Sequence, residues 1–348
     1  MALSLEQVPV AQTGVYPTPL QPLERLSRQL GGARLWVKRD DLTGLAFGGS
    51  KTRSLGTLLG RALAEGANTV ITCGPTTSNH VRLTAAAANQ LGLKVVLVLR
   101  QPKDGAPALQ GNMLLNQVLG ARLVYAEVDG LAGLEPVMEQ VAEALRGQGA
   151  KPFIIPGGGY SPTGALGYIG LVQELAQQSQ AAGFGIDAVV FASGSGCIQS
   201  GLLLGALATG TRLPVIGLTI NRSVAELVPR IHHDVQAAAA LIGLDGHLPA
   251  DAVQVLDDYI GQGYAIPSEA GMEAIDLLAR EEGLLLDPCY TGKSMAGAMD
   301  LARLRFKPGQ NVVFIHTGGT PGIFSYADAL VRPHGDAAHS AQLAGSAH

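Results

Sequence analysis

Short apolar runs alternate with longer amphipathic segments along most of the chain. The apolar runs are rich in β-branched residues and have the length of buried strands. They occupy residues 69–73, 94–99, 122–127, 152–156, 188–192, 214–220 and 311–316. Parallel strand pairs need a crossover of about a dozen residues or more, which a helix supplies, and strands that are apolar throughout are covered on both faces. The pattern therefore predicts an α/β fold with mostly parallel sheets between layers of helices.

One predicted helix begins directly after a glycine pair, in the stretch "LAFGGSKTRSLGTLLG" at residues 45–60. Four apolar residues share one face of this helix at a 3.6-residue period: Leu55, Leu58, Leu59 and Ala62. This spacing puts Lys51 at the helix start, where the partial positive charge of the helix disfavours an ammonium group. Lys51 is therefore either an ordinary surface lysine or a lysine with a chemical task.

Length, charge and cysteine content narrow the class of protein. At 348 residues the chain exceeds what one core usually serves, so we expect two domains. Its 24 Lys and Arg against 28 Asp and Glu give a net charge of -4 without any basic block, which argues against nucleic acid as a partner. The three cysteines, Cys73, Cys197 and Cys289, are scattered, which argues against disulfides and metal sites.

The two ends of the chain and one internal stretch bear on its organisation. The first residues lack a secretory leader pattern, and no uninterrupted apolar run reaches about 18 residues. We therefore expect a soluble cytoplasmic protein with no membrane partner. The Gly- and Pro-rich "PGGGYSPTG" at residues 156–164 is the best candidate for a domain junction. The C-terminal "PHGDAAHSAQLAGSAH" has the composition of a loose tail.

Ligands of such folds bind beyond the carboxyl ends of the strands, and four turns there carry candidate chemistry. The first, in "AVVFASGSGCIQSGL", places Gly194, Ser195 and Gly196 before a helix that opens near Cys197. Backbone N–H groups and the helix dipole suit such a turn to a phosphate. A GxGxxG dinucleotide fingerprint is missing, because Gln199 takes the position of its third glycine. The turn is therefore either a monophosphate site or only a tight glycine turn.

The other three turns are polar and also allow structural roles. In "TTSNHVRL", Ser78 and Asn79 are either helix caps or donors to a substrate carboxylate. In "DPCYTGK", Tyr290 either packs in the core or acts as an acid or base, which requires a pKa well below about 10. In "HTGGTPG", His316 suits a satisfied core histidine, and the glycines permit close approach to a flat ligand.

Taken together, these features suit pyridoxal phosphate. That cofactor needs a lysine for its Schiff base, an anion cradle for its phosphate and a polar clamp for the carboxylate of an amino acid. Lys51, the glycine turn and the polar turns offer one of each.

Several motifs occur in the order found in the D-cysteine desulfhydrase and 1-aminocyclopropane-1-carboxylate deaminase family. They are "YPTPLQPLERLSRQLGGARLWVKRDDL", "FGGSKTRSLGTLL", "SNHVRLTAA", "GSGCIQSGL", "LDPCYTGKSMAG" and "HTGGTPGIF". The resemblance covers about residues 14–331. The family is similar in fold to the tryptophan synthase β subunit, the second fold type of pyridoxal phosphate enzymes. The resemblance therefore implies two open, twisted, mostly parallel sheets, each covered by helices, and a homodimer.

The resemblance also implies a division of the chain. A large cofactor-binding domain would comprise residues 1–52 and 161–332, and a small domain residues 53–160. Residues 333–348 would form a flexible tail.

The resemblance further assigns roles to single residues. Lys51 would form the Schiff base and then serve as the base at Cα, with Ser78 and Tyr290 as the other catalytic residues. Cofactor contacts fall to Lys51, Asn79 at the ring oxygen, the phosphate turn of Gly194, Ser195, Gly196, Cys197 and Ile198, then Thr291 and Thr317 near the ring nitrogen, and Gly318. Substrate contacts fall to Ser78, Asn79, His80, Tyr160 and Tyr290, with Ser78 and His80 beside the carboxylate.

Two chemistries within the family differ at one position. Ring-opening deaminases usually carry glutamate after the tyrosine, whereas this chain has Thr291 after Tyr290. We therefore favour β-elimination from a small β-substituted amino acid such as D-cysteine, which releases pyruvate, ammonia and sulfide. The alternatives are 1-aminocyclopropane-1-carboxylate deamination with Ser78 as the nucleophile or as the residue that orients it, L-cysteate sulfo-lyase activity, and amino-acid racemisation.

Three positions depart from the family pattern. Ser50 replaces a usual asparagine, Thr77 a usual glutamine and Tyr160 a small residue, often serine. The pocket therefore also suits L-cysteate, 3-chloroalanine or a larger β-substituted amino acid. Two other classes of protein fit the sequence less well. A relative that binds without turnover would not need to keep Lys51 and Tyr290, and a nicotinamide-dependent dehydrogenase would need the missing GxGxxG.

Overall fold

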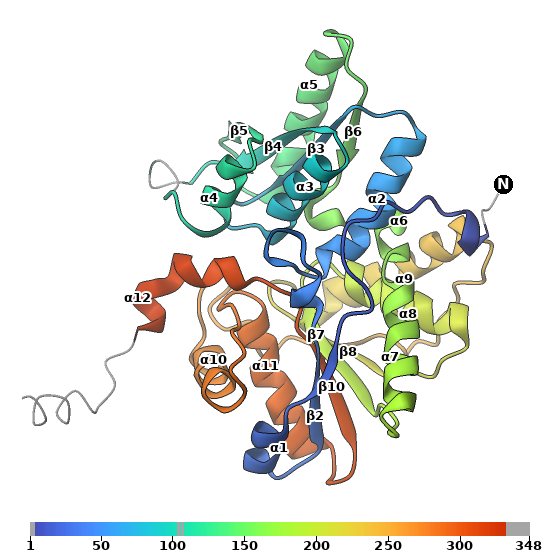
Figure 1. Cartoon of the computed structure of the whole chain (residues 1–348), viewed down its shortest axis with the longest axis vertical. Helices are drawn as coiled ribbons and strands as arrows, with labels where there is room; N and C mark the ends of the chain where they lie inside the picture. Colours follow the sequence, from blue (N-terminus) through green and yellow to red (C-terminus); the bar gives the residue numbers. More distant parts are fainter. Residues whose placement is uncertain (1–3, 103–104, 106–107, 332–348) are drawn as a thin grey trace, which may run out of the picture.

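The computed structural model describes residues 4–102, 105 and 108–331 and contains two sheets covered by helices (Figure 1). The larger sheet has six strands in the order β1-β2-β10-β7-β8-β9. These are β1 (Leu20–Pro22), β2 (Arg34–Lys38), β10 (Asn311–Ile315), β7 (Ala188–Ser193), β8 (Val215–Thr219) and β9 (Gln254–Leu256). Only the edge strand β1 is antiparallel to its neighbour in this sheet.

The smaller sheet has four parallel strands in the order β5-β4-β3-β6. They are β3 (Thr69–Gly74), β4 (Lys94–Arg100), β5 (Arg122–Ala126) and β6 (Pro152–Ile155). All four come from one continuous stretch of chain, whereas the six-stranded sheet joins strands from both sides of that stretch.

Helices connect the strands and cover both sheets. They are α1 (Glu24–Leu30), α2 (Lys51–Ala64), α3 (Asn79–Gln90), α4 (Gly111–Val118), α5 (Leu134–Arg146), α6 (Pro162–Leu166), α7 (Ile169–Ala181), α8 (Cys197–Thr209), α9 (Val224–Leu241), α10 (Glu269–Glu282), α11 (Thr291–Asp300) and α12 (Ala327–Leu330). No helix of the described residues is long and apolar enough to cross a membrane.

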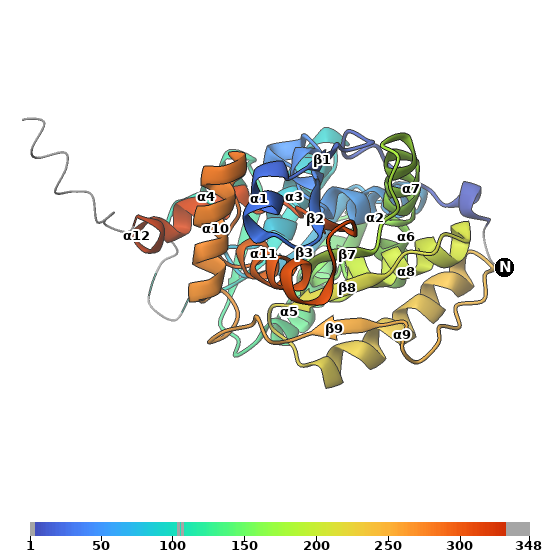
Figure 2. The same ribbon diagram turned by 90° about the horizontal axis from the view of Figure 1, so that it is seen from below.

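Each sheet separates two apolar cores, as expected for strands that are apolar throughout. In β7, Val189 and Phe191 pack under helices α6 to α9, and Val190 packs under α1, α10 and α11 on the other face (Figure 2). In β4, Leu97 packs under α2, α3 and α4, and Val98 packs against α5. The predicted α/β fold with mostly parallel sheets is therefore confirmed.

All seven predicted strands are present, and three further strands were missed. β1 and β9 have only three residues each, too few for a periodic signal. β2 begins and ends with a charged residue, and its last residue, Lys38, is buried. Lys38 Nζ lies 2.6 Å from a carboxylate oxygen of Glu174, far away in the sequence, and this ion pair makes its burial possible.

The helix expected at Lys51 is also confirmed. It spans Lys51–Ala64, and the four apolar residues that predicted it are buried. The predicted tail at residues 333–348 lies outside the described residues. The candidate junction at residues 156–164 runs from the end of β6, the last strand of the four-stranded sheet, into the first three residues of α6.

Candidate functional site

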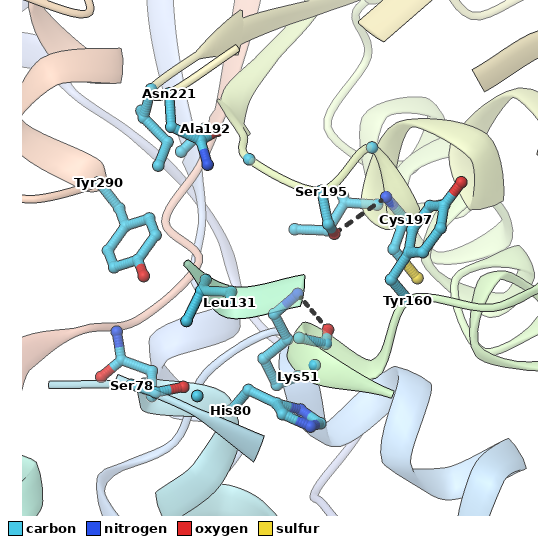
Figure 3. Close-up of a pocket in the computed structure, with 18 of the residues that line it drawn as sticks. Lys51, Ser78, His80, Leu131, Tyr160, Ala192, Ser195, Cys197, Asn221 and Tyr290 are labelled. Atoms are coloured by element: carbon cyan, nitrogen blue, oxygen red, sulfur yellow. Dashed lines mark hydrogen bonds between the residues drawn. The ribbon is translucent and has the colours of Figure 1, made fainter. Parts of the chain in front are cut away.

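A cavity of about 310 Å³ lies where the carboxyl ends of both sheets meet (Figure 3). Residues that follow five strands line it: β3 and β6 of the smaller sheet, and β7, β8 and β10 of the larger. The first residue of α2 and the last residue before α11 line it as well. The four turns selected from the sequence therefore converge on one cavity, as parallel sheets require.

Lys51 reaches into this cavity from the first position of α2. Gly49, with φ of 136°, allows the chain to approach the turn after β10, because a Cβ there would lie 3.1 Å from the Thr317 carbonyl oxygen. Lys51 Nζ donates a hydrogen bond to the Gly158 carbonyl oxygen at 2.9 Å (Figure 3). Burial lowers the pKa of Lys51, because desolvation disfavours its ammonium form. Lys51 thus offers an amine that is more reactive than a surface lysine.

The glycine turn after β7 brings backbone N–H groups to another part of the cavity. Gly196 has φ of 92°, and a Cβ there would lie 3.1 Å from Ile231 Cγ1. Helix α8 begins at the next residue, Cys197, so the unpaired N–H groups of its first turn face the same end. Ser195 Oγ accepts a hydrogen bond from the Cys197 N–H at 3.4 Å (Figure 3). This arrangement suits an anion of phosphate size.

Ser78 and Asn79 begin helix α3 at the cavity wall. Ser78 Oγ accepts a hydrogen bond from the Val81 N–H at 3.3 Å, so Ser78 is the helix cap, and its own hydroxyl hydrogen remains for a ligand. Asn79 Oδ1 accepts hydrogen bonds from Arg82 at 3.0 Å and from Asn112 at 2.9 Å. These two donors fix which atom of the amide is oxygen and leave its N–H₂ group for a ligand.

His80 lines the cavity as a neutral imidazole. Burial, and then the charge of Lys51, lower the pKa of His80 to about 3. Thr72 Oγ1 donates to the Ile155 carbonyl oxygen at 2.8 Å, so it accepts from His80 Nε2 at 2.9 Å. His80 Nδ1 is then an acceptor, and it has no partner in the described part of the chain. The His80 ring therefore offers a carboxylate no hydrogen-bond donor, whereas the Ser78 hydroxyl does, and the place of His80 beside the carboxylate stays a prediction.

Tyr290 shares a hydrogen bond with Tyr264, which the sequence analysis did not select. The two rings meet edge to face with centroids 5.9 Å apart, and both line the cavity. Burial raises the pKa of both phenols. Acid or base chemistry was expected to need a lowered pKa at Tyr290, and the shift has the opposite direction. At neutral pH the pair therefore acts through protonated hydroxyls.

The turn after β10 contains one confirmed structural residue and two residues that line the cavity. His316 is buried, with Nε2 3.0 Å from the Leu285 carbonyl oxygen and Nδ1 accepting from the Gly318 N–H at 3.3 Å. It is a satisfied core histidine, as predicted. Thr317 and Gly318 line the cavity, and a Cβ on Gly318 would lie 2.7 Å from Gly49 Cα.

Thr291 is the one predicted site residue that does not line the cavity. Its hydroxyl donates to Asp287 Oδ1 at 2.7 Å and accepts from the Asp287 N–H at 2.8 Å. The same carboxylate accepts from the N–H groups of Cys289, Tyr290 and Thr291. Asp287 thus fixes the start of α11, and the contact between Thr291 and the ring nitrogen stays a prediction.

Tyr160 lines the cavity with its ring, and its hydroxyl points away from Lys51 (Figure 3). The Arg230 guanidinium lies 3.5 Å from the centroid of this ring. Burial and Asp234 raise the pKa of Tyr160. Tyr160 therefore provides a wall of the site, and its polar end faces α9.

Several further lining residues were missed by sequence reasoning: Leu131, Glu135, Asn221, Arg222, Arg230 and Tyr264. Tyr264 lies in the glycine-rich "GQGYAIP", a loop signal that could have been followed. The others have no local signal, because the tertiary fold brings them to the cavity.

The residues present fit pyridoxal phosphate. A reactive lysine, a glycine turn without side chains in the way and an amide with free N–H groups surround one cavity. Gly318 lines the cavity, and its backbone packs against Gly49 so closely that a Cβ on Gly318 would lie 2.7 Å from Gly49 Cα.

Comparisons with known proteins agree with this fit. The family model described as pyridoxal-phosphate dependent enzyme matches residues 11–318. A D-cysteine desulfhydrase of Salmonella choleraesuis is 44% identical over 315 residues, which cover 89% of this chain and 94% of that protein. A Pyrococcus abyssi protein, provisionally named a 1-aminocyclopropane-1-carboxylate deaminase, is 44% identical over 316 residues, which cover 91% of this chain and 93% of that protein.

Solved structures give the same result for the fold. The crystal structure of an ACC deaminase homologue matches with a TM-score of 0.87 and 37% identity, covering 94% of this chain and 97% of that one. O-ureido-L-serine synthase matches with a TM-score of 0.66 at 18% identity, covering 98% of this chain and 99% of that one, a likeness of fold alone. The chain belongs to the family of pyridoxal-phosphate-dependent enzymes, and pyridoxal phosphate is its cofactor.

Proposed function

We propose that the protein is a lyase that eliminates the β-substituent of a small amino acid, with D-cysteine as the favoured substrate and pyruvate, ammonia and sulfide as products. The observation that carries this proposal is the desolvated amine of Lys51 in the same cavity as the donor Ser78 and the protonated phenols Tyr264 and Tyr290. The 44% identity to a D-cysteine desulfhydrase over most of both chains supports it.

We propose that the cofactor is held by residues from both sheets. Lys51 is the point of covalent attachment, the turn Gly194–Ile198 takes the phosphate, and the free N–H₂ group of Asn79 meets the ring oxygen. Thr291, Thr317 and Gly318 border the ring, the first from behind the cavity wall. When bound, pyridoxal phosphate withdraws electrons from the Cα–H bond of the amino acid.

The side chains of this protein then have distinct tasks. Ser78 Oγ–H donates to the substrate carboxylate and orients it. Lys51 Nζ, once free, takes the proton from Cα, and the burial that lowers its pKa favours the neutral amine that this step needs. The bond from Cβ to the sulfur breaks, and the protonated hydroxyl of Tyr290 donates a hydrogen bond to the departing thiolate. Water enters afterwards and releases pyruvate and ammonia.

One observation favours a second candidate substrate, L-cysteate. Arg222 and Arg230 line the cavity, and Nε of each is buried without a hydrogen bond to the described residues. Guanidinium groups bind oxyanions such as a sulfonate. The departing group would then be sulfite in place of sulfide, and the tasks of Lys51 and Ser78 would stay the same. Ring opening of 1-aminocyclopropane-1-carboxylate and racemisation are the remaining alternatives on this scaffold.

A panel of substrates tests the proposal. The holoenzyme is mixed with D-cysteine, L-cysteine, L-cysteate, 3-chloro-D-alanine or 1-aminocyclopropane-1-carboxylate, and pyruvate, 2-oxobutyrate, sulfide and sulfite are assayed. Pyruvate with sulfide from D-cysteine is the expected result. Release of 2-oxobutyrate would replace elimination by ring opening, and no product from any compound would contradict the proposed lyase activity.

We also propose the expected organisation and location: a homodimer in the cytoplasm, with domains at residues 1–52 and 161–332 and at residues 53–160. The domain boundaries have support in the strands, since every strand of the four-stranded sheet falls within 53–160 and every strand of the other sheet outside it. Sedimentation velocity at several protein concentrations tests the dimer.

A further inference from the structure

Lys293 is a buried lysine for which the proposed function has no task. It lies on α11, one turn after Tyr290, and its side chain is buried. Nζ donates to the carbonyl oxygens of Ile260 at 2.6 Å and Gly263 at 2.8 Å. Within the described residues, both hydrogen bonds of this nitrogen go to carbonyl oxygens and none goes to a carboxylate. The partners of the ammonium group are therefore backbone carbonyls.

Those carbonyls belong to the loop between β9 and α10 that carries Tyr264. Gly261, Gly263 and Ala265 in this loop all have positive φ, of 65°, 141° and 62°. Positive φ is strained for an alanine, so the loop needs anchors to keep its shape. Lys293 is one anchor, and the Tyr326 hydroxyl, which donates to the Ala265 carbonyl oxygen at 2.8 Å, is another.

The positive charge of Lys293 has a physical reason. Two carbonyl oxygens directed at one point repel each other unless a cation or a strong donor lies between them. Burial lowers the pKa of Lys293, whereas the nearby acidic groups Cys289 and Asp287 raise it. The carbonyls and Asp287 together compensate the buried charge.

Helix α11 thus connects the two phenols of the cavity. Tyr290 is the residue before the helix. Lys293 on the same helix binds the carbonyl oxygen of Gly263, and Tyr264 is the next residue of that loop. We propose that Lys293 is a positioning residue: its ammonium group holds the loop so that the Tyr264 hydroxyl meets the Tyr290 hydroxyl, and this pairing decides which phenolic hydrogen points at the substrate. The inference rests on the proposed function of Tyr290.

A double-mutant cycle in the holoenzyme tests this proposal. We compare Lys293→Met, Tyr264→Phe and the double variant for kcat and KM with the substrate identified by the panel, and Lys307→Met, at an exposed lysine, is the matched control. A misplacement of about 1 Å in a catalytic group costs about 100-fold in rate. We therefore expect Lys293→Met to lower kcat by about 10- to 100-fold, with KM and cofactor affinity within about twofold of wild type.

The double variant separates positioning from a general structural role. If Lys293 acts through Tyr264, the double variant has the same kcat as Tyr264→Phe alone. Losses that multiply, or an unchanged kcat in Lys293→Met, would overturn the proposal. If Lys293→Met does not fold, Lys293→Arg replaces it in the cycle, because it keeps the charge in a larger group. We then expect Lys293→Arg to lower kcat in the wild-type background and to leave kcat unchanged in the Tyr264→Phe background.

The outcomes also distinguish this inference from the proposed function. If the wild-type enzyme catalyses elimination but the losses in kcat of the two single variants multiply in the double variant, only the proposed role of Lys293 is rejected. Absence of elimination from the wild-type enzyme across the whole panel would reject the proposed function itself.

Discussion

The turn after β7 and the tyrosine pair both form walls of the cavity, and they are built by opposite means. The turn at Gly194–Cys197 presents backbone N–H groups, and its shape depends on residues that lack side chains. The pair Tyr264 and Tyr290 presents side-chain hydroxyls whose places depend on loops far apart in the sequence. Backbone walls suit a fixed cofactor, whereas side-chain walls can differ between relatives with different substrates.

Lys51 lines the same cavity as both walls, and its removal has the largest expected effect. Lys51→Ala removes the proposed attachment point of the cofactor and the proposed base, so we expect elimination to fall by about 10³-fold or more. Pyruvate release is the measurement, and Lys307→Met is the control. An alanine variant with wild-type turnover would contradict both roles of Lys51.

Gly196 tests the backbone wall alone. Gly196→Ala and Gly210→Ala, at the two ends of α8, both place alanine at positive φ, and each costs about 1–2 kcal/mol of unfolding free energy. A Cβ on Gly196 would press on Ile231, whereas a Cβ on Gly210 would meet no atom within 4 Å. We expect only Gly196→Ala to weaken cofactor binding, by about tenfold, a change of about 1.4 kcal/mol. Equal cofactor affinity in both variants would contradict the proposal that this turn binds the phosphate of the cofactor.

Replacing His80, which lines the cavity, tests its neutral state through the pH dependence of the unfolding free energy. Its pKa in the folded protein, about 3, lies below the ordinary value of 6.5, so the unfolded chain binds the additional proton first as the pH falls. Stability therefore decreases from about pH 6.5 downward, by up to about 1.4 kcal/mol per pH unit from this group.

Urea unfolding of His80→Gln between pH 6.5 and 4.5 measures this contribution. We expect a shallower pH dependence than in wild type, and no change in His247→Gln, where the histidine is exposed. A slope equal to that of wild type would contradict a neutral His80.

Thr291 tests the support of the side-chain wall, with the smallest expected effect. Thr291→Val removes one donor to the buried Asp287 carboxylate and one acceptor for the Asp287 N–H. We expect a loss of about 1–2 kcal/mol in unfolding free energy, and recovery in Thr291→Ser. Wild-type stability of the valine variant would show that these hydrogen bonds contribute little. A shift in the absorbance of the bound cofactor would support the predicted contact with the ring nitrogen.

The backbone wall could be predicted from the sequence, and only one of the two residues of the side-chain wall could. Lys51 at a helix start and the turn at Gly194–Cys197 follow from local spacing and from glycine. Their meeting follows from the rule that parallel strands gather their carboxyl ends at one edge. Tyr290 was also found, from its place before a helix.

Tertiary contacts determine the features of the site that the sequence did not predict. Nothing near Tyr290 in the sequence identifies Tyr264 as its partner, and the upward shift of its pKa comes from burial. The sequence analysis did not identify the Asp287 carboxylate as the hydrogen-bond partner of the Thr291 hydroxyl. The tautomer of the neutral His80 ring depends on Thr72 and Ile155, which come from two different strands.

The central claim is that Lys51 carries the cofactor in the cavity that both walls line. Borohydride reduction of the holoenzyme fixes pyridoxal phosphate to the lysine that holds it, and peptide mass spectrometry then identifies that lysine. The account predicts the added mass on the peptide containing Lys51. The added mass on any other lysine, or on none, would contradict it.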